Sequence, residues 1–179
     1  MTDMIYLDNA ATSFPKPPEV AQYISHFLNN MGGTYGRSAY QRVFETTTAV
    51  EHTRDILAQQ LGTKLASNIL FTHNATHGIN VLLQGLNLHS CTVLISPLEH
   101  NAVMRPITHI AQQNSITIKT FPHAPDGSID IECIDSLLTS DTQLAIVNHQ
   151  SNINGVIQPV AAIKKKLGHV PLLLDTAQS

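Results

Sequence analysis

The sequence predicts an α/β fold with a mostly parallel sheet covered by helices on both faces. From residue 69 onward, short apolar runs of strand length alternate with longer segments that repeat apolar residues at helical spacing. Each segment between two apolar runs is long enough for the crossover helix that a parallel strand pair requires. The apolar runs are also nearly continuous, which is typical of strands buried on both faces.

The elements follow one another in a regular order from residue 69. Strands are expected at ILFT (69–72), CTVLIS (91–96), SITIKTF (115–121), QLAIVNH (143–149) and PLLLD (171–175). Helices are expected at 75–86, at 101–113 around Pro106, near Asp130 after an Asp126-Gly127 turn, and at 159–168, where Gly168 ends the helix.

The first 65 residues lack this alternation. Pro17 and Pro18 predict the start of a helix that runs to about Leu28. A glycine-rich stretch follows, and a second, long helix is expected from about Thr46 to Leu61. We therefore predict that residues 1–65 form a helical arm that lies against the sheet domain and has no sheet of its own. Residues 66–179 are predicted to be the first part of an α/β domain.

Composition excludes several classes of protein. The net charge of -3 gives no reason to expect nucleic acid or an anionic membrane as a partner. The N-terminus lacks the pattern of a signal peptide, and no apolar run could span a bilayer, so a cytoplasmic location is expected. Charged residues make up 13% of the chain, which suggests that more chain or a partner covers part of the surface. Cys91 and Cys133 are interpreted as two buried thiols.

Polar residues follow four of the expected strands. The segments are THNATHG (72–78), SPLEHN (96–101), NHQSNINGV (148–156) and DTAQS (175–179). In open α/β sheets, ligands bind at the carboxyl ends of the strands, so these segments are expected along one rim. A polar ligand could be held there by Thr76, His100, Asn152, Asp175 and Gln178.

The first of these segments, THNATHG, could bind an ion. Backbone N–H groups near Ala75, Thr76 and His77, with the Thr76 hydroxyl, could bind a phosphate, although simple capping by Asn74 or Thr72 explains the same residues. His73 and His77 have the spacing of zinc ligands on a helix. The glutamate of HExxH is absent, however, and His73 precedes the helix, so no metal site is predicted.

Asp175 is the most informative single residue. An acid at the tip of an apolar strand is costly unless a cation pairs with it. The protonated ring nitrogen of pyridoxal 5′-phosphate (PLP) is such a cation, and Gln178 could reach an oxygen of the same ring. His100 could stack on a flat ligand or move a proton, although a histidine here could equally be a cap or a core residue.

These residues also resemble those of a known family. YLDNAATSFPKP, FTHNATHGIN, EHNAV, SNINGVIQP and LLLDTAQS are similar, in order and spacing, to motifs of the PLP-dependent class V aminotransferase and cysteine desulfurase family. SFPKPPEV, GRSAY and HQSNING are closest to a desulfurase-like branch. The resemblance implies a PLP-dependent transferase of fold type I, like aspartate aminotransferase, of which residues 66–179 would be an incomplete PLP-binding large domain.

The resemblance implies a role for each matching residue. Ala75 and Thr76 would hold the cofactor phosphate, and His100 would stack on the ring and assist proton transfer. Asn152 and Gln178 would contact the oxygen side of the ring, and Asp175 would pair with the ring nitrogen. The family implies a homodimer that removes sulfur from cysteine to leave alanine, or selenium from selenocysteine, and a protein that accepts the sulfur is a possible partner.

One departure from the family's pattern concerns catalysis. The Schiff-base lysine of the family lies some two dozen residues beyond the DxAQ motif, and no residue of this chain matches it. Lys164, Lys165 and Lys166 are expected on a solvated helix face. We therefore expect the 179 residues alone to be inactive and to be the front part of a longer enzyme. A naturally truncated product without activity, an aminotransferase with another amino-acid substrate and a simple phosphate-binding module are the alternatives.

Overall fold

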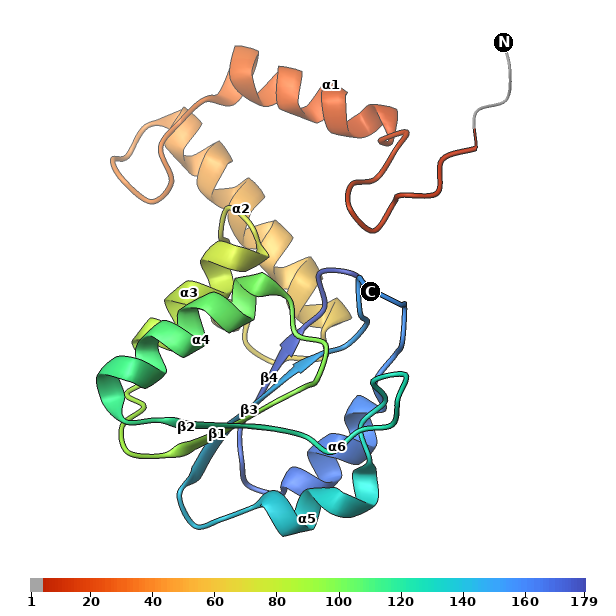
Figure 1. Ribbon diagram of the computed structural model, residues 1–179. Helices are drawn as coiled ribbons and strands as arrows, with labels where there is room; N and C mark the ends of the chain where they lie inside the picture. The colour runs from red at the N-terminus through yellow and green to blue at the C-terminus, as the bar shows by residue number, and fades with distance from the viewer. Residues whose placement is uncertain (1–4) are drawn as a thin grey trace. The chain divides into compact units, whose positions relative to one another are not determined.

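The structure is a computed structural model that describes residues 5–179. The chain forms two compact units, divided between Phe71 and Thr72, and the ribbon in Figure 1 shows the elements of each. The described part of the first unit is helical. The second unit contains a four-stranded sheet.

The N-terminal unit is built around two helices, α1 (Pro18–His26) and α2 (Gln41–Gln60). A π-helical turn, η1 (Phe27–Met31), continues α1, and a short 3-10 turn, η2 (Ala66–Asn68), follows α2. Helix α2 begins at Gln41, earlier than the expected start near Thr46, because Val43 and Thr46 are both buried and tertiary packing stabilises the first turn.

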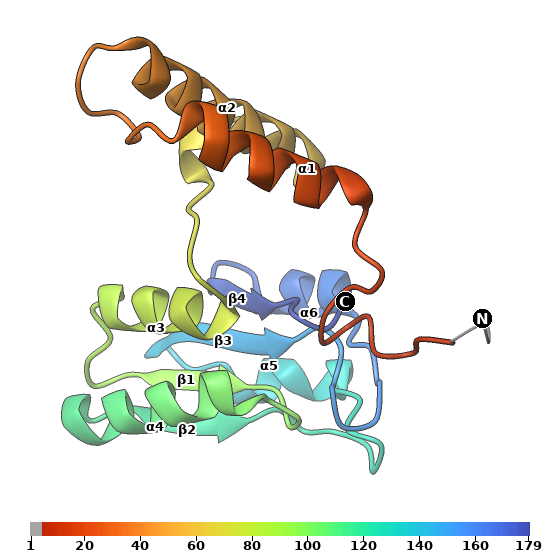
Figure 2. The same cartoon turned by 90° about the horizontal axis from the view of Figure 1, so that it is seen from above.

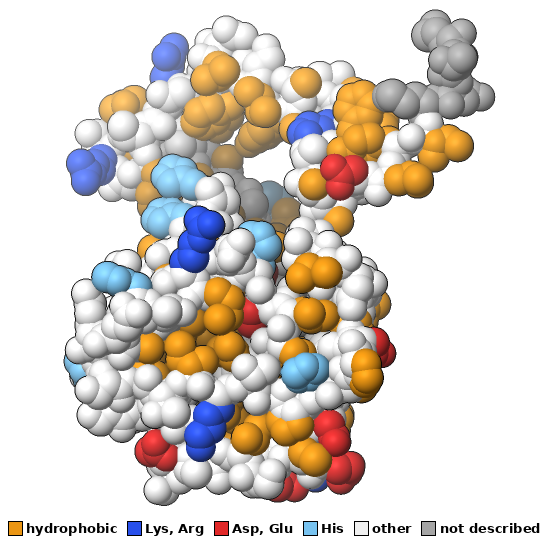
Figure 3. Space-filling model, viewed as in Figure 1, with side chains coloured by type: hydrophobic (Ala, Val, Ile, Leu, Met, Phe, Trp, Pro, Cys, Tyr) orange, Lys and Arg blue, Asp and Glu red, His pale blue; other side chains and the backbone are white. Residues whose placement is uncertain are grey.

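Many hydrophobic side chains of the N-terminal unit are exposed, and Figure 3 shows several such patches on the face in view. Leu28, Phe44, Leu61 and Leu70 are among the most exposed. One polar cluster is well packed, because the Arg54 guanidinium lies over the rings of Tyr35 and Phe71, 5.5 and 5.6 Å from their centroids. The exposed area is consistent with a surface that other protein normally covers.

The C-terminal unit is an alternating α/β unit with a wholly parallel sheet, as the sequence predicted. Its strands are in the order β2-β1-β3-β4, with bounds β1 (Thr92–Ile95), β2 (Thr117–Thr120), β3 (Thr142–Asn148) and β4 (Leu172–Asp175). Its helices are α3 (Ala75–Gly85), α4 (Asn101–Asn114), α5 (Ile134–Leu137) and α6 (Val160–Leu167), and α5 follows a 3-10 turn, η3 (Ile131–Cys133).

The sheet lies between two layers of helix, as Figures 1 and 2 show. Val93 and Ile95 of β1 pack with buried side chains of α3 and α4, such as Leu83 and Ile107. The intervening Leu94 packs on the other face with buried residues that include those of α5 and α6. Successive strand residues point to opposite faces, so an uninterrupted apolar strand supplies both cores.

The expected strand at residues 69–72 is wrong. The backbone at Ile69 is extended, with φ -88° and ψ 114°, but no other described segment pairs with this stretch. The side chains of Leu70 and Phe71 are 73% and 51% exposed. An apolar run becomes a strand only where a neighbouring backbone completes its hydrogen bonds, and the described chain supplies none here.

Candidate functional site

The carboxyl ends of the strands converge on one pocket. Its volume is about 180 Å³, and its lining residues are Asn74, Ala75, Thr76, His100, Ala102, Asn148, Asn152, Asp175, Ala177 and Gln178. The parallel register pairs Asn148 of β3 with Asp175 of β4, which brings two of the polar strand ends together. The structure thus gathers all six residues that the sequence singled out. The roles of these residues in binding a cofactor stay predictions.

Helix α3 contributes its N-terminus to this pocket. The Asn74 side chain caps the helix, because its Oδ1 accepts a hydrogen bond from the His77 backbone N–H at 2.8 Å. The expectation of a free N–H at His77 is therefore wrong, since the cap occupies it. The N–H groups of Ala75 and Thr76 have no acceptor among the described residues, so both can still bind a ligand.

His100 caps helix α4 and lines the pocket. Its Nδ1 accepts a hydrogen bond from the Ala102 backbone N–H at 3.1 Å, so this nitrogen carries no proton in that arrangement. The neutral ring must then carry its proton on Nε2. The cap fixes the ring at the start of the helix, and it leaves the Nε2–H group as the one that can exchange a proton. The capping role and the predicted ligand role are therefore compatible.

Asp175 is a buried acid at the tip of β4, with 8% of its surface exposed. Its Oδ1 accepts a hydrogen bond from the Ala177 backbone N–H at 3.0 Å, which also orders the segment that carries Gln178. Among residues 5–179, no cation forms an ion pair with Asp175 and no donor reaches its Oδ2. The pocket therefore holds a carboxylate oxygen suited to a cationic N–H group.

Two residues of the site region were not singled out from the sequence, although both lie in segments that were. The Asn148 side chain is buried and donates from Nδ2 to the Leu98 carbonyl at 3.1 Å. Glu99 Oε1 accepts hydrogen bonds from Ser96 Oγ at 2.5 Å and from the Asn148 backbone N–H at 2.8 Å. These contacts join the end of β1 to the end of β3.

Glu99 is also unusual as an acid. Its Oε2 is buried without a hydrogen-bond partner in the described part of the chain. Burial raises the pKa of the Glu99 carboxyl, the charge of Asp175 raises it further, and the hydrogen bonds from Ser96 and Asn148 partly oppose both effects. The Glu99 carboxyl therefore favours the neutral form more than an exposed glutamate does.

No lysine lines the pocket. The expectation that the lysines of α6 lie on a solvated face is only partly correct. Lys164 Nζ donates to the carbonyls of Gly168 and Val170, at 2.8 and 2.9 Å, beyond the C-terminus of α6. Lys166 Nζ pairs with Asp135 at 2.8 Å. The contacts of both lysines thus lie around α5 and α6, and neither lysine lines the strand-end pocket.

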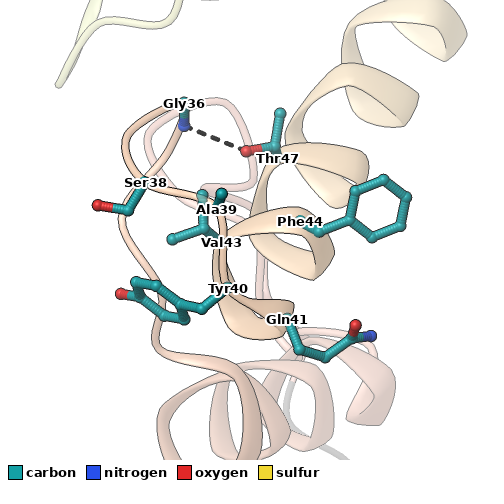
Figure 4. Close-up of a pocket in the computed structure, with 8 residues that line it drawn as sticks. All are labelled: Gly36, Ser38, Ala39, Tyr40, Gln41, Val43, Phe44 and Thr47. Atoms are coloured by element: carbon teal, nitrogen blue, oxygen red, sulfur yellow. Dashed lines mark hydrogen bonds between the residues drawn. The ribbon is translucent and has the colours of Figure 1, made fainter.

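A larger pocket of about 470 Å³ lies in the N-terminal unit. Figure 4 shows its lining, in which Gly36 donates a backbone hydrogen bond to Thr47 Oγ1 at 3.1 Å and Tyr40 and Phe44 supply aromatic rings. No carboxylate, histidine, lysine or arginine lines this pocket. Its only side chain that could move a proton at a phenol is that of Tyr40 among the described residues, and we assign the pocket no role in the reaction.

The two histidines near α3 form a stacked pair. The rings of His73 and His77 stack with their centroids 5.2 Å apart and their planes at 17°. Within residues 5–179, no group of three potential metal ligands gathers at this or any other place.

Cys91 is buried, whereas Cys133 is only half-buried and donates its thiol hydrogen to Asp130, so the expectation of two buried thiols holds only for Cys91. Among residues 5–179, no helix is both long and apolar enough to cross a membrane.

Parallel strands, crossover helices and polar residues gathered at the strand ends define a ligand-binding α/β domain. The family model for aminotransferase class-V matches residues 5–179, and the chain belongs to this family. A probable cysteine desulfurase of Mycolicibacterium paratuberculosis is 31% identical over 98% of this chain. The solved structure of a NifS-like protein is 27% identical over 98% of the chain, with a TM-score of 0.85.

One solved structure with the same fold contains PLP. A C-DES mutant that contains glycine covalently linked to its PLP cofactor shares the fold, with 23% identity, a TM-score of 0.71 and coverage of 89% of this chain. The chain spans 26% of the Mycolicibacterium relative and 49% of the NifS-like chain. It therefore represents about half the length of such proteins, or less.

Proposed function

We propose that the strand-end pocket binds PLP and that the chain is the cofactor-binding part of a cysteine desulfurase-like enzyme. That enzyme would release sulfur from cysteine to give alanine. The observation that carries the proposal is the single pocket formed by all four polar segments, three of which follow strands, with the unpaired carboxylate of Asp175 inside it. The names of the relatives, which are cysteine desulfurases, support cysteine as the substrate.

The lining residues fit the cofactor group by group. The free N–H groups of Ala75 and Thr76, with the Thr76 hydroxyl, would bind the phosphate. Asp175 would accept a hydrogen bond from the ring N–H and keep the proton on that nitrogen. Asn152 and Gln178 carry amides that would donate to the oxygen side of the ring.

When bound, PLP supplies an electron sink for charge that develops at the substrate carbon. Asp175 supports this chemistry because its charge stabilises the protonated ring nitrogen. His100 would cover one face of the ring and move a proton through Nε2, since Nδ1 is held by the Ala102 N–H. The burial of Asp175 lowers the local dielectric constant and strengthens its interaction with a cation.

The test is the substitution Asp175→Asn, which keeps an oxygen for the Ala177 N–H but removes the charge. We expect the Kd for PLP, measured by calorimetry, to rise about 10–100-fold, as for the loss of a charged hydrogen bond. Binding of inorganic phosphate should not change. Asp135→Asn, on α5 in an exposed ion pair with Lys166, is the matched control and should bind PLP like the wild type.

The same measurements separate the proposal from the phosphate-binding module. If Asp175→Asn and Asp175→Ala both bind PLP as tightly as the wild type, the acid has no part in binding the ring and the module is favoured. An aminotransferase with a different substrate would instead show the Asp175 effect but release no sulfide from cysteine in the full-length enzyme.

We further propose that the 179 residues alone do not turn over cysteine. None of the lysines lies in the pocket, so no amine is available there to anchor the cofactor covalently. The purified chain with PLP and cysteine should release neither alanine nor sulfide above the rate of free PLP. Sustained production of both by the chain would contradict this proposal.

We also propose that the full-length protein is a cytoplasmic homodimer and that it passes sulfur to an acceptor protein. The exposed hydrophobic side chains of the N-terminal unit and the charged fraction of 13% support a large partner surface. Sedimentation of the full-length protein should give the mass of two chains. A monomer at micromolar concentration would count against a dimer.

A further inference from the structure

A second pocket adjoins the proposed cofactor pocket. Its volume is about 320 Å³, and it shares Thr76, His100 and Ala102 with the first. The side chains of Asn80 and Arg105 are among its other lining groups. The two pockets thus meet at the residues where helices α3 and α4 begin. A ligand group bound at Thr76 lies at the boundary between them.

Among the described residues, Arg105 is the only positively charged one that lines either of these pockets. It lies on α4, one turn beyond Asn101, and its side chain is exposed. No described residue forms a hydrogen bond or an ion pair with its guanidinium, and no carboxylate lines the second pocket. The side chain also borders a further hollow beside Met104 and His109.

Opposite formal charges lie in the two adjoining pockets. Asp175 provides the only formal negative charge in the first pocket, and Arg105 provides a positive charge in the second. His100 is neutral while its Nδ1 accepts from Ala102. Thr76, with its free N–H and hydroxyl, lies where the pockets meet. This arrangement matches a ligand with a cationic ring at one end and a phosphate dianion at the other.

We propose that Arg105 supplies the positive charge that balances the phosphate of the cofactor. The inference rests on the proposed function, because it assumes that the first pocket holds the PLP ring. Ala75 and Thr76 offer only neutral donors, which leaves the charge of a dianion unbalanced within the first pocket. A guanidinium presents several N–H donors in one plane and binds phosphate through two of them at once.

The arrangement has a consequence for helix packing. Ala75 and Thr76 begin α3, whereas Arg105 lies in the second turn of α4. A phosphate bound by all three residues would connect the two helices at their N-terminal ends. Cofactor binding would therefore order the Arg105 side chain and strengthen the contact between α3 and α4, and pyridoxal, which lacks the phosphate, would do neither.

The test compares ligands with and without phosphate. The Kd values of PLP and of pyridoxal are measured by calorimetry for the purified 179-residue chain, for Arg105→Gln and for Arg105→Lys. We expect Arg105→Gln to bind PLP about tenfold more weakly than the wild type and to bind pyridoxal unchanged. Arg105→Lys, which keeps the charge but not the planar donors, should recover part of the loss.

Lys165→Gln is the matched control, because it removes one positive charge from the exposed surface of α6, on the other face of the sheet. It should bind PLP like the wild type. Equal PLP affinity in Arg105→Gln and the wild type would overturn the inference while leaving the proposed function intact. An equal loss of PLP and pyridoxal binding would also overturn it. A wild-type chain that does not bind PLP at all would overturn both.

Discussion

Replacing Glu99 by glutamine tests whether the buried acid beside the pocket is held in its neutral form. The amide keeps Oε1, so it can still accept from Ser96 Oγ and from the Asn148 N–H. The change affects Oε2, which is buried without a partner and can no longer become charged. The substitution therefore separates the charge of Glu99 from its two hydrogen bonds.

The sign of the effect follows from the raised pKa of the Glu99 carboxyl, whose first cause is burial. The folded state prefers the neutral acid, so the stability from Glu99 is fully present below the ordinary glutamate pKa. It is lost as the pH rises through the raised pKa of the folded state. A buried, unpartnered oxygen costs about 1–3 kcal/mol. The amide nitrogen of glutamine is unpartnered at the same position, so the predicted effect is the change with pH. We expect the free energy of unfolding of the wild type to fall by about 1–3 kcal/mol relative to that of Glu99→Gln between pH 4 and pH 8.

The assay must report on the C-terminal unit alone. The chain has no tryptophan, and its tyrosines all precede Phe71, so fluorescence would follow the N-terminal unit. Hydrogen exchange of the β3 peptide, followed by mass spectrometry in a urea series from pH 4 to pH 8, avoids this problem. Glu132→Gln is the control, since its side chain is 86% exposed. A stability difference that does not change with pH would refute the reasoning.

Three further substitutions and one control test the packing around the site, by hydrogen exchange of peptides throughout the C-terminal unit. Leu83→Ala removes a fully buried side chain of α3 and should lower the free energy of unfolding by about 2–5 kcal/mol. A loss below about 1 kcal/mol would contradict the two-layer core. Asn74→Ala removes the cap of α3 and should cost about 1 kcal/mol, with faster exchange confined to its first turn. Gly127→Ala places a Cβ 2.5 Å from Leu98 Cδ1 at a φ of +87° and should cost about 1–3 kcal/mol. Gly85→Ala, which meets no atom within 4 Å, should cost nothing, so equal effects at the two glycines would disprove the steric argument.

Local pattern was sufficient for most of the C-terminal unit. The runs that became β1, β3 and β4 have consecutive apolar residues because each strand contributes to two cores, and a parallel sheet needs helices between such strands. The same topology explains why residues as far apart as His100 and Asp175 could be assigned to one rim. The carboxyl ends of parallel strands meet at one edge whatever the loops between them contain.

Tertiary structure alone decided the remaining features, because each depends on a partner that is distant in sequence. The run at residues 69–72 has the composition of a strand, but the described chain provides no backbone to pair with it. In the sequence, Glu99 looks like an ordinary loop acid. Only the structure shows its contact with the end of β3, where the Asn148 N–H donates to it. In the sequence, Arg105 looks like a residue on the surface of a helix. Only the structure shows that it lines the same pocket as Thr76. The sequence by itself determined which chemical groups reach the rim, and only the packing of β3, α3 and α4 decided which of them are buried, capped or left free to bind a ligand.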